Sequence, residues 1–379
     1  MTLLADPTAR PLVLPEPPPA TDAFTRIDTF AALREAEGDW GRHLRLGRER
    51  AAAFRAEFAT AGQPDFVGTY DLVGVPYPTK FGLWRAAISP VPFLTITNRM
   101  FVIRWTDSDS RRRTLLFEPS DIDLDENTPY FAALRKKGAE FLRPVIAPRH
   151  GDVLTHLQTL AIDPAEVDYI TFDHLHTQDV RRWIGTTKPQ RDISPSGPVP
   201  AAFPNARLIV QRPELEAMRD LHPLQRPWYQ PETYVDLPPD KLLVIDGDFL
   251  LGPGVALLST PGHAAGNQSL VLNTSTGIWT SSENAIAAEC MTPEHSKIPG
   301  VARWARTWGQ EVILNANTVE ATAQQYNSMV IEKTIPDRAQ SDSRFVQFFP
   351  SSEMTARWTA PGLSPTFVHG GIAHGRLNG

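Results

Sequence analysis

Asp173-His174-Leu175-His176-Thr177-Gln178-Asp179 follows a run of β-branched and aromatic residues, 167–172, which predicts a buried strand. Two histidines at positions i and i+2 of an extended segment point to the same side, so His174 and His176 can converge on one ion. Neutral imidazole is a common ligand of zinc and related metals. Asp179 could add an oxygen ligand or take a proton from water. The pair alone leaves a second interpretation open, because solvated residues at a strand end can have the same spacing.

A third histidine, His263, lies in the segment Thr260-Pro261-Gly262-His263, directly after a predicted strand at 255–259. Gly262 and Gly266 permit backbone conformations that are closed to other residues, and Pro261 stiffens the approach to the histidine. A histidine held in such a turn between two buried strands is well fixed. It could be a metal ligand or a core histidine bonded to a nearby carbonyl.

The rest of the chain shows short apolar runs broken by Gly, Pro, Asn or Asp, which predict strands, and segments of helical periodicity. The predicted strands are 66–75, 84–88, 94–97, 101–105, 114–117, 167–172, 206–211, 241–245, 255–259, 269–272, 277–279 and 311–314. The predicted helices lie within 28–60 and at 128–137, 151–160, 213–221 and 319–333. Strands and helices in this order predict a layered α/β protein with helices covering the sheets.

Composition excludes several classes of protein. The 379 residues are 41% hydrophobic, enough for a sizeable core, and carry a net charge of −6 without a long basic run, so nucleic acid is not expected as a partner. The single cysteine, Cys290, excludes an intramolecular disulfide and a cysteine-rich zinc site. No segment has the ~20 apolar residues of a membrane span, and residues 1–21 lack a signal-peptide pattern. We therefore expect a cytoplasmic protein without a membrane partner.

The two histidine segments, in this order, resemble the metallo-β-lactamase superfamily. The stretch 206–216, with Asp246-Gly247-Asp248 and Gly252-Pro253-Gly254 after it, is similar to the branch that holds the N-acyl homoserine lactonases, as is 163–168 before the histidines. The resemblance covers roughly residues 65–375. It implies an αββα sandwich with metals at one edge, here preceded by an N-terminal helical extension. We expect residues 1–62 to form the arm and extension, and 63–379 the metallo-β-lactamase-like domain.

The sequence departs from the family pattern His-x-His-x-Asp-His in its last two positions, which are Gln178 and Asp179. The resemblance further implies a carboxylate ligand after a later strand, for which Glu283 is the candidate, and a last histidine, for which His369 is the candidate and His374 the reserve. The first metal site is thus intact, whereas the second has lost its usual carboxylate and histidine. We expect one tight zinc and a weak, absent or rearranged second metal, with iron or manganese as alternative elements.

Together these residues predict a metal-dependent hydrolase that opens a lactone or cleaves another carboxylic ester of a small-molecule substrate. In this prediction metal-activated water is the nucleophile, and Asp179 or Glu283 holds it and moves its proton. Two alternatives stay open: a non-hydrolytic redox or lyase metalloenzyme of specialised metabolism, and a metal-poor binding protein on the same fold. The N-terminal extension could mediate a homodimer.

Two other acidic or histidine-bearing segments are given structural interpretations. Asp121, Asp123 and Asp125 alternate with apolar residues but lack the spacing of a calcium loop, so we interpret them as a solvated face. Glu294-His295, in a proline-flanked loop, is interpreted as a solvated pair.

Overall fold

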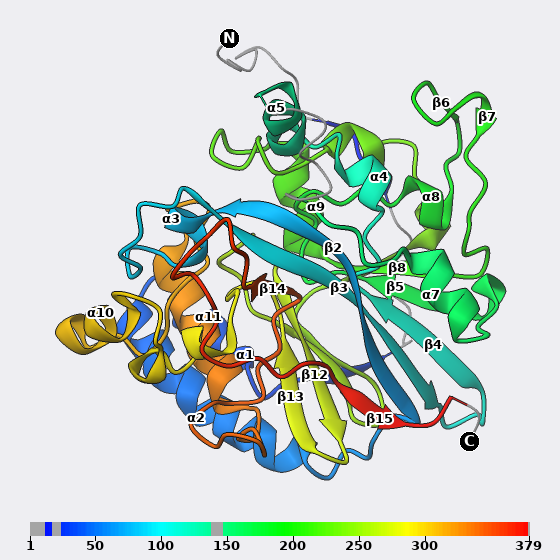
Figure 1. The fold of residues 1–379 in the computed structure, drawn as a ribbon. Coiled ribbons are helices and arrows are strands. Elements are labelled where there is room, and N and C mark those ends of the chain that lie inside the picture. The colour runs from blue at the N-terminus through cyan, green and yellow to red at the C-terminus, as the bar shows by residue number, and fades with distance from the viewer. Residues whose placement is uncertain (1–11, 17–23, 138–146, 378–379) are drawn as a thin grey trace.

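The computed structural model describes residues 12–16, 24–137 and 147–377, and two large sheets form its centre (Figure 1). The first sheet has the order β1-β10-β11-β12-β13 and is antiparallel. Its strands are β1 (Thr25–Ile27), β10 (Asp248–Gly252), β11 (Val255–Ser259), β12 (Gln268–Thr274) and β13 (Gly277–Ser281).

The second sheet has the order β15-β2-β3-β4-β5-β8-β9, and β14 pairs with β3. The strands from β4 to β9 run parallel, and the others are antiparallel. They are β2 (Phe66–Pro78), β3 (Phe93–Thr106), β4 (Arg112–Phe117), β5 (Tyr169–Thr171), β8 (Arg207–Gln211), β9 (Leu242–Ile245), β14 (Ser352–Thr355) and β15 (Ala373–Gly375). A separate hairpin pairs β6 (Pro189–Gln190) with β7 (Ser194–Pro198) and projects from the body (Figure 1).

Alternation along the strands divides the core into layers, because successive side chains of a strand face opposite ways. On β11, Val255 and Leu257 join the cluster between the two sheets, whereas Ala256 and Leu258 join the cluster under the outer helices. On β3, the odd-numbered residues from Phe101 to Trp105 likewise face the first sheet, and Val102 faces the other way. The sheets therefore pack face to face with one core between them and one outside each.

Helices cover both outer faces, and this completes the predicted αββα sandwich. The long helices α2 (Trp40–Phe58) and α11 (Thr322–Thr334) lie side by side over the first sheet (Figure 1). Phe54 and Phe58 of α2 and Ile331 of α11 enter the same cluster as Ala256. On the other face, α7 (Val153–Thr159) and α9 (Arg212–Arg219) pack against the second sheet through Leu157, Leu215 and their neighbours.

Shorter helices fill the connections between these elements. They are α1 (Ala31–Arg34), α3 (Thr79–Gly82), α4 (Ile122–Asp125), α5 (Pro129–Lys137), α8 (Arg181–Ile184) and α10 (Val301–Trp308). The predicted N-terminal helical extension is present as α1 and α2, and it forms part of the outer helical layer. The predicted domain boundary at residue 62 stays a prediction. Among the described residues, none of the helices is long and apolar enough to span a bilayer.

Two predicted strands, 84–88 and 311–314, are wrong. Residues 84–88 form turns after α3, and 311–314 are extended without a ladder. The two segments bond to each other and to other loops instead: Trp84 donates to the Leu314 carbonyl (3.2 Å), and Ile313 donates to the Cys290 carbonyl (2.8 Å). A loop segment held by isolated backbone hydrogen bonds can bury its apolar side chains as a strand does. Composition alone therefore could not distinguish these loops from strands.

Candidate metal centre

Three histidines from the edges of the two sheets meet in one cluster. His174 and His176 lie in the loop after β5, and His263 lies in the turn after β11. One ring nitrogen from each lies within 4.8 Å of the other two, and all three side chains are buried. The interpretation of His263 as a core histidine accounts for its burial but not for this convergence.

In each ring, the nitrogen that faces away from the cluster is hydrogen-bonded to a protein oxygen. This bond fixes the direction of the nitrogen that faces the cluster. His174 Nδ1 bonds to the Asp173 carboxylate, and His263 Nδ1 donates to the Asn315 carbonyl at 2.7 Å. His176 Nε2 donates to Gln225 Oε1 at 2.7 Å. Metal-binding histidines are characteristically oriented in this way by carboxylates, carbonyls and amides.

The protein gives the inward-facing nitrogens few donors, of which the Asn317 amide, 3.3 Å from His176 Nδ1, is one. His174 Nε2 is buried and has no hydrogen-bond partner among the described residues. His176 Nδ1 and His263 Nε2 face each other at 3.4 Å. Two of the three outer bonds, those of His176 and His263, put the proton on the outer nitrogen, which leaves lone pairs pointing into the cluster. The donor set therefore fits a cation that accepts three imidazole nitrogens, as zinc does.

Burial and mutual repulsion keep two of the rings neutral. Burial, reinforced by the neighbouring His174, lowers the pKa of His263 to about 3, and the same two causes lower the pKa of His176 well below its usual value. Burial also opposes protonation of His174, but the Asp173 carboxylate outweighs it and raises the pKa of His174 to about 9. A cation in the cluster would take the place of that single proton.

Glu214, on α9, connects the two histidine loops. Its carboxylate is buried and accepts from the Leu175 amide (2.7 Å), between the first two histidines, and from the Gly266 amide (2.9 Å), just after the third. The Tyr229 hydroxyl donates to it as well, at 2.6 Å. A Cβ at Gly266 would lie 2.3 Å from Glu214 Cβ, so glycine is needed for this approach. We did not predict this role. The available signal was an acidic residue in the first turn of a helix directly after a strand.

Glu283 lies beside the cluster without joining it. It lines the same cavity as the three histidines and interacts with Ser352 and Asn315. Burial raises the pKa of its carboxyl to about 7, against the opposing effect of His174. Its oxygens are not among the ligand atoms that lie within 4.8 Å of one another, so Glu283 lines the cavity outside the histidine cluster.

Asp179 is not brought to the three histidines. Its carboxylate is buried and held by the Arg181 guanidinium, with Nε at 3.0 and 3.1 Å from its two oxygens and Nη2 at 2.6 Å from one of them. Arg181 in turn pairs with Asp192 at 2.6 Å. The carboxylate that follows Gln178 therefore has a structural partner in place of a metal. The Gln178 side chain itself lines the cavity.

The structure does not bring His369 or the reserve candidate His374 to the cluster either. His369 Nε2 donates to the Val346 carbonyl (3.0 Å), and its ring packs edge-on against Trp279 with centroids 4.9 Å apart. His374 bonds to the Pro64 carbonyl (2.9 Å) and to Ser275 (3.0 Å) at the edge of the second sheet. Both rings are bonded to other parts of the protein, and neither lies in the histidine cluster.

The histidine cluster opens into a cavity of about 770 Å³ with mostly apolar walls. Its aromatic side chains are Tyr77, Phe93, Tyr130, Phe131 and Trp228. Asp125 also lines it, which corrects the interpretation of residues 121–125 as a solvated face. Asp121 and Asp125 are both buried, because Asp121 caps the N-terminus of α4 and Asp125 is its last residue. A volume of this size suits a small organic molecule.

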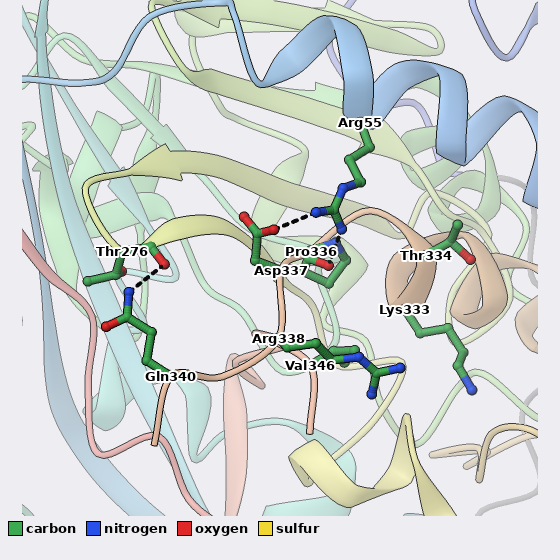
Figure 2. A pocket seen from close by; sticks show the side chains of 9 residues that line it. All are labelled: Arg55, Thr276, Lys333, Thr334, Pro336, Asp337, Arg338, Gln340 and Val346. Carbon is green, nitrogen blue, oxygen red and sulfur yellow. Dashed lines mark hydrogen bonds and ion pairs between the residues drawn. The ribbon is translucent and has the colours of Figure 1, made fainter. Parts of the chain in front are cut away.

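A second hollow, of about 660 Å³, lies between α2 and the segment after α11 (Figure 2). Each of its three cationic side chains donates to a protein oxygen: Arg55 to Asp337 and the Pro336 carbonyl, Lys333 to the Glu311 carbonyl and Arg338 to the Arg344 carbonyl. Gln340 bonds to the Thr276 carbonyl. None of the three clustered histidines lines it, so the candidate site is the apolar cavity.

Comparison with known proteins gives partial matches in sequence. The chain is 34% identical over 122 residues to an N-acyl homoserine lactonase of Bacillus thuringiensis and 33% identical over 122 residues to one of Bacillus cereus. Each match covers 32% of this chain and 39% of the relative, so the matched segment spans well under half the length of these curated relatives. No family model matches.

The solved structures that match this chain have low sequence identity and TM-scores below 0.5. An N-acyl homoserine lactone hydrolase with bound N-hexanoyl-L-homoserine is 20% identical, covers 66% of this chain and 90% of its own, and has a TM-score of 0.42. A dizinc quorum-quenching lactonase is 11% identical with coverage of 84% and 98% and a TM-score of 0.46. A probable metal-dependent hydrolase from Staphylococcus aureus is 10% identical with coverage of 70% and 83% and a TM-score of 0.48.

The sequence match agrees with the residues that suggested it, and the layers of the fold agree with the architecture that the resemblance implied. The predicted resemblance to the N-acyl homoserine lactonase-like branch of the metallo-β-lactamase superfamily is therefore confirmed over the 122 matched residues, and the predicted αββα sandwich is confirmed by the layers of the fold.

Proposed function

We propose that the chain is a metal-dependent hydrolase that opens a lactone or cleaves another carboxylic ester. The observation that carries the proposal is the cluster of three buried imidazoles, each oriented by a second oxygen partner, at the end of an apolar cavity. The partial sequence match to lactonases supports the type of bond.

His174, His176 and His263 would hold the metal, and we propose a single zinc. When bound, zinc would supply a Lewis acid that acidifies water and polarises a carbonyl oxygen. Asp173, Gln225 and Asn315 keep the three rings in place through their outer nitrogens. A second metal lacks a carboxylate at the usual place, because Arg181 holds Asp179 and the preceding residue is a neutral amide.

Glu283 would accept the proton of the attacking water on its carboxylate. Its pKa near 7 means that the carboxylate is half available at neutral pH, which suits a general base. The same group could then return the proton to the leaving alkoxide. The apolar walls of the cavity exclude bulk water and give the ester its binding energy.

The test combines metal analysis with a substrate panel. The purified protein should carry about one zinc per chain and hydrolyse lactones or aryl esters, and His176→Ala and His263→Ala should lose both the metal and at least ~100-fold in turnover. His374→Ala is the matched control, because this histidine bonds to Pro64 and Ser275.

Full metal content in His176→Ala would contradict the ligand assignment. A metal-loaded protein that hydrolyses no ester or lactone in the panel would contradict the activity. Iron with oxygen-dependent turnover would instead favour the redox alternative.

A further inference from the structure

The side chain of Gln178 is a buried amide whose oxygen has no partner in the part of the chain that the structure describes. It is 6% exposed and lines the cavity together with His174 and His176. Its Oε1 has no hydrogen-bond partner among the described residues. Leaving a buried acceptor unpaired is unfavourable, and such groups in folded proteins are nearly always satisfied by a ligand or water when the protein offers nothing.

The backbone around Gln178 is tightly held, so the direction of the amide is built into the loop. Its own N–H donates to the Leu175 carbonyl (3.3 Å), and the Tyr234 hydroxyl donates to its carbonyl (2.9 Å). The preceding residue, Thr177, has a φ of +65° and donates to the Trp228 carbonyl at 2.6 Å. A loop with this many fixed groups, one of them in a conformation unusual for threonine, aims the amide at the cavity.

Metal binding is a poor explanation for this amide. The cluster of candidate ligands among the described residues contains the three histidines only. The neighbouring carboxylate of Asp179, which could have helped a second cation, is held by Arg181. A neutral amide oxygen attracts a divalent cation more weakly than a carboxylate does.

We propose that Gln178 binds substrate, and that its Oε1 accepts a hydrogen bond from a hydroxyl group on an aromatic ester or lactone. The free acceptor can bind a hydrogen-bond donor of the ligand. The cavity walls formed by Phe93, Tyr130, Phe131 and Trp228 suit a flat apolar ring that carries this donor. The inference rests on the proposed function in taking the ligand to be an ester. A substrate contact thus stands where a second metal ligand would otherwise lie.

The experiment uses binding in place of turnover, so it does not depend on catalysis. The probes are 1-tetralone, a cyclic aryl ketone that cannot be hydrolysed, and its ring-hydroxylated isomers, titrated into the metal-loaded protein by calorimetry. At least one hydroxylated isomer should bind roughly 5- to 30-fold more tightly than 1-tetralone, the value of one desolvated hydrogen bond. Gln178→Met, of similar shape, should bind both alike. Gln178→Glu, which keeps an acceptor, should keep the preference.

Ser120→Ala is the matched control, since Ser120 also lines the cavity with an unpartnered buried hydroxyl. The preference should survive in this variant. Equal binding of all probes to the native protein, or a preference that survives in Gln178→Met, would overturn the proposal. A lower metal-to-protein ratio in Gln178→Met would make Gln178 a ligand and overturn it too. Failure of the ester panel with an intact tetralone preference would count against the proposed function alone.

Discussion

Glu214→Gln tests whether one buried carboxylate positions both histidine loops. In the native protein the carboxylate accepts three hydrogen bonds, from the Leu175 amide, the Gly266 amide and the Tyr229 hydroxyl. A glutamine can keep the two that meet at Oε1, but its amide group would then face the Gly266 N–H, donor against donor. The variant loses one charge-assisted bond and leaves a buried donor unpaired, which should cost about 2–4 kcal/mol of unfolding free energy in the metal-free protein.

If Glu214 only supports the fold, the substitution lowers stability and leaves zinc affinity unchanged. If Glu214 positions the histidine loops, the substitution lowers zinc affinity as well. Because Leu175 lies between two of the histidines, and Gly266 follows the third closely, loosening Glu214 lets the ring nitrogens separate. Oxygen partners that orient metal ligands are typically worth 10- to 100-fold in metal affinity, so we expect zinc to bind ~10- to 100-fold more weakly to Glu214→Gln. Urea unfolding of the metal-free protein and zinc competition with a chromogenic chelator measure the two effects separately.

Glu332→Gln is the matched control. Glu332 is equally buried and accepts from Ser269, Ser282 and Asn284, yet it bonds to neither histidine loop. All three bonds meet at Oε1, which a glutamine can keep, so this variant should lose less stability than Glu214→Gln, and its zinc affinity should stay within ~3-fold of the native value. If Glu214→Gln is destabilised but binds zinc as the native protein does, Glu214 only supports the fold and the positioning argument is refuted.

Three further predictions concern the fold and its edges. Gly262 has a φ of +143°, and a Cβ there would lie 2.2 Å from the backbone of Gln325, so Gly262→Ala should lower the unfolding free energy by about 3 kcal/mol or more in urea melts and weaken zinc binding through His263. Burial raises the pKa of Asp248 from 3.8 to about 7, so the folded protein binds this proton more tightly than the unfolded chain does, and stability falls as the pH rises from about 4 to 7. Asp248→Asn removes this pH dependence. The unfolding free energy of the variant, relative to that of the native protein, should therefore rise by up to ~4 kcal/mol across the same pH range and then level off. His369→Ala should keep its full metal content by elemental analysis, because His369 bonds to Val346, and loss of the metal would restore it as a ligand.

The sequence was sufficient for the parts of the fold that repeat regular patterns. Strand runs such as 255–259 and 206–211 are continuous apolar segments, and both sheets contain them almost as predicted. The missed strands β14 and β15 are short, and what makes them strands is pairing with distant segments, such as Ser352 with Asn98 and His374 with Val67. Pairing over such distances leaves no local periodicity, so a single sequence cannot reveal it.

The same distinction divides the candidate site. His174, His176 and His263 could be found because the chain places them directly after strands, and the ends of strands determine where side chains meet. The roles of Asp179 and Glu214 depend on partners elsewhere in the fold, namely Arg181 and the Leu175 and Gly266 amides. The spacing of residues in the sequence shows where a carboxylate lies in the chain but not which cation or amide it binds in the fold.

Arg181 accounts for the burial of Asp179, which stands where the family pattern has a histidine. A buried carboxylate needs a positive partner, since an unpaired buried charge is strongly unfavourable. Arg181 supplies it with two nitrogens and is itself held by Asp192 on the loop between β6 and β7, so the charge stays balanced without a cation. Gln178 needs no such compensation, because an amide is neutral, and its free oxygen can face the cavity. At the two positions that differ from the family pattern, Arg181 thus neutralises the carboxylate of Asp179, and the neutral amide of Gln178 lines the cavity.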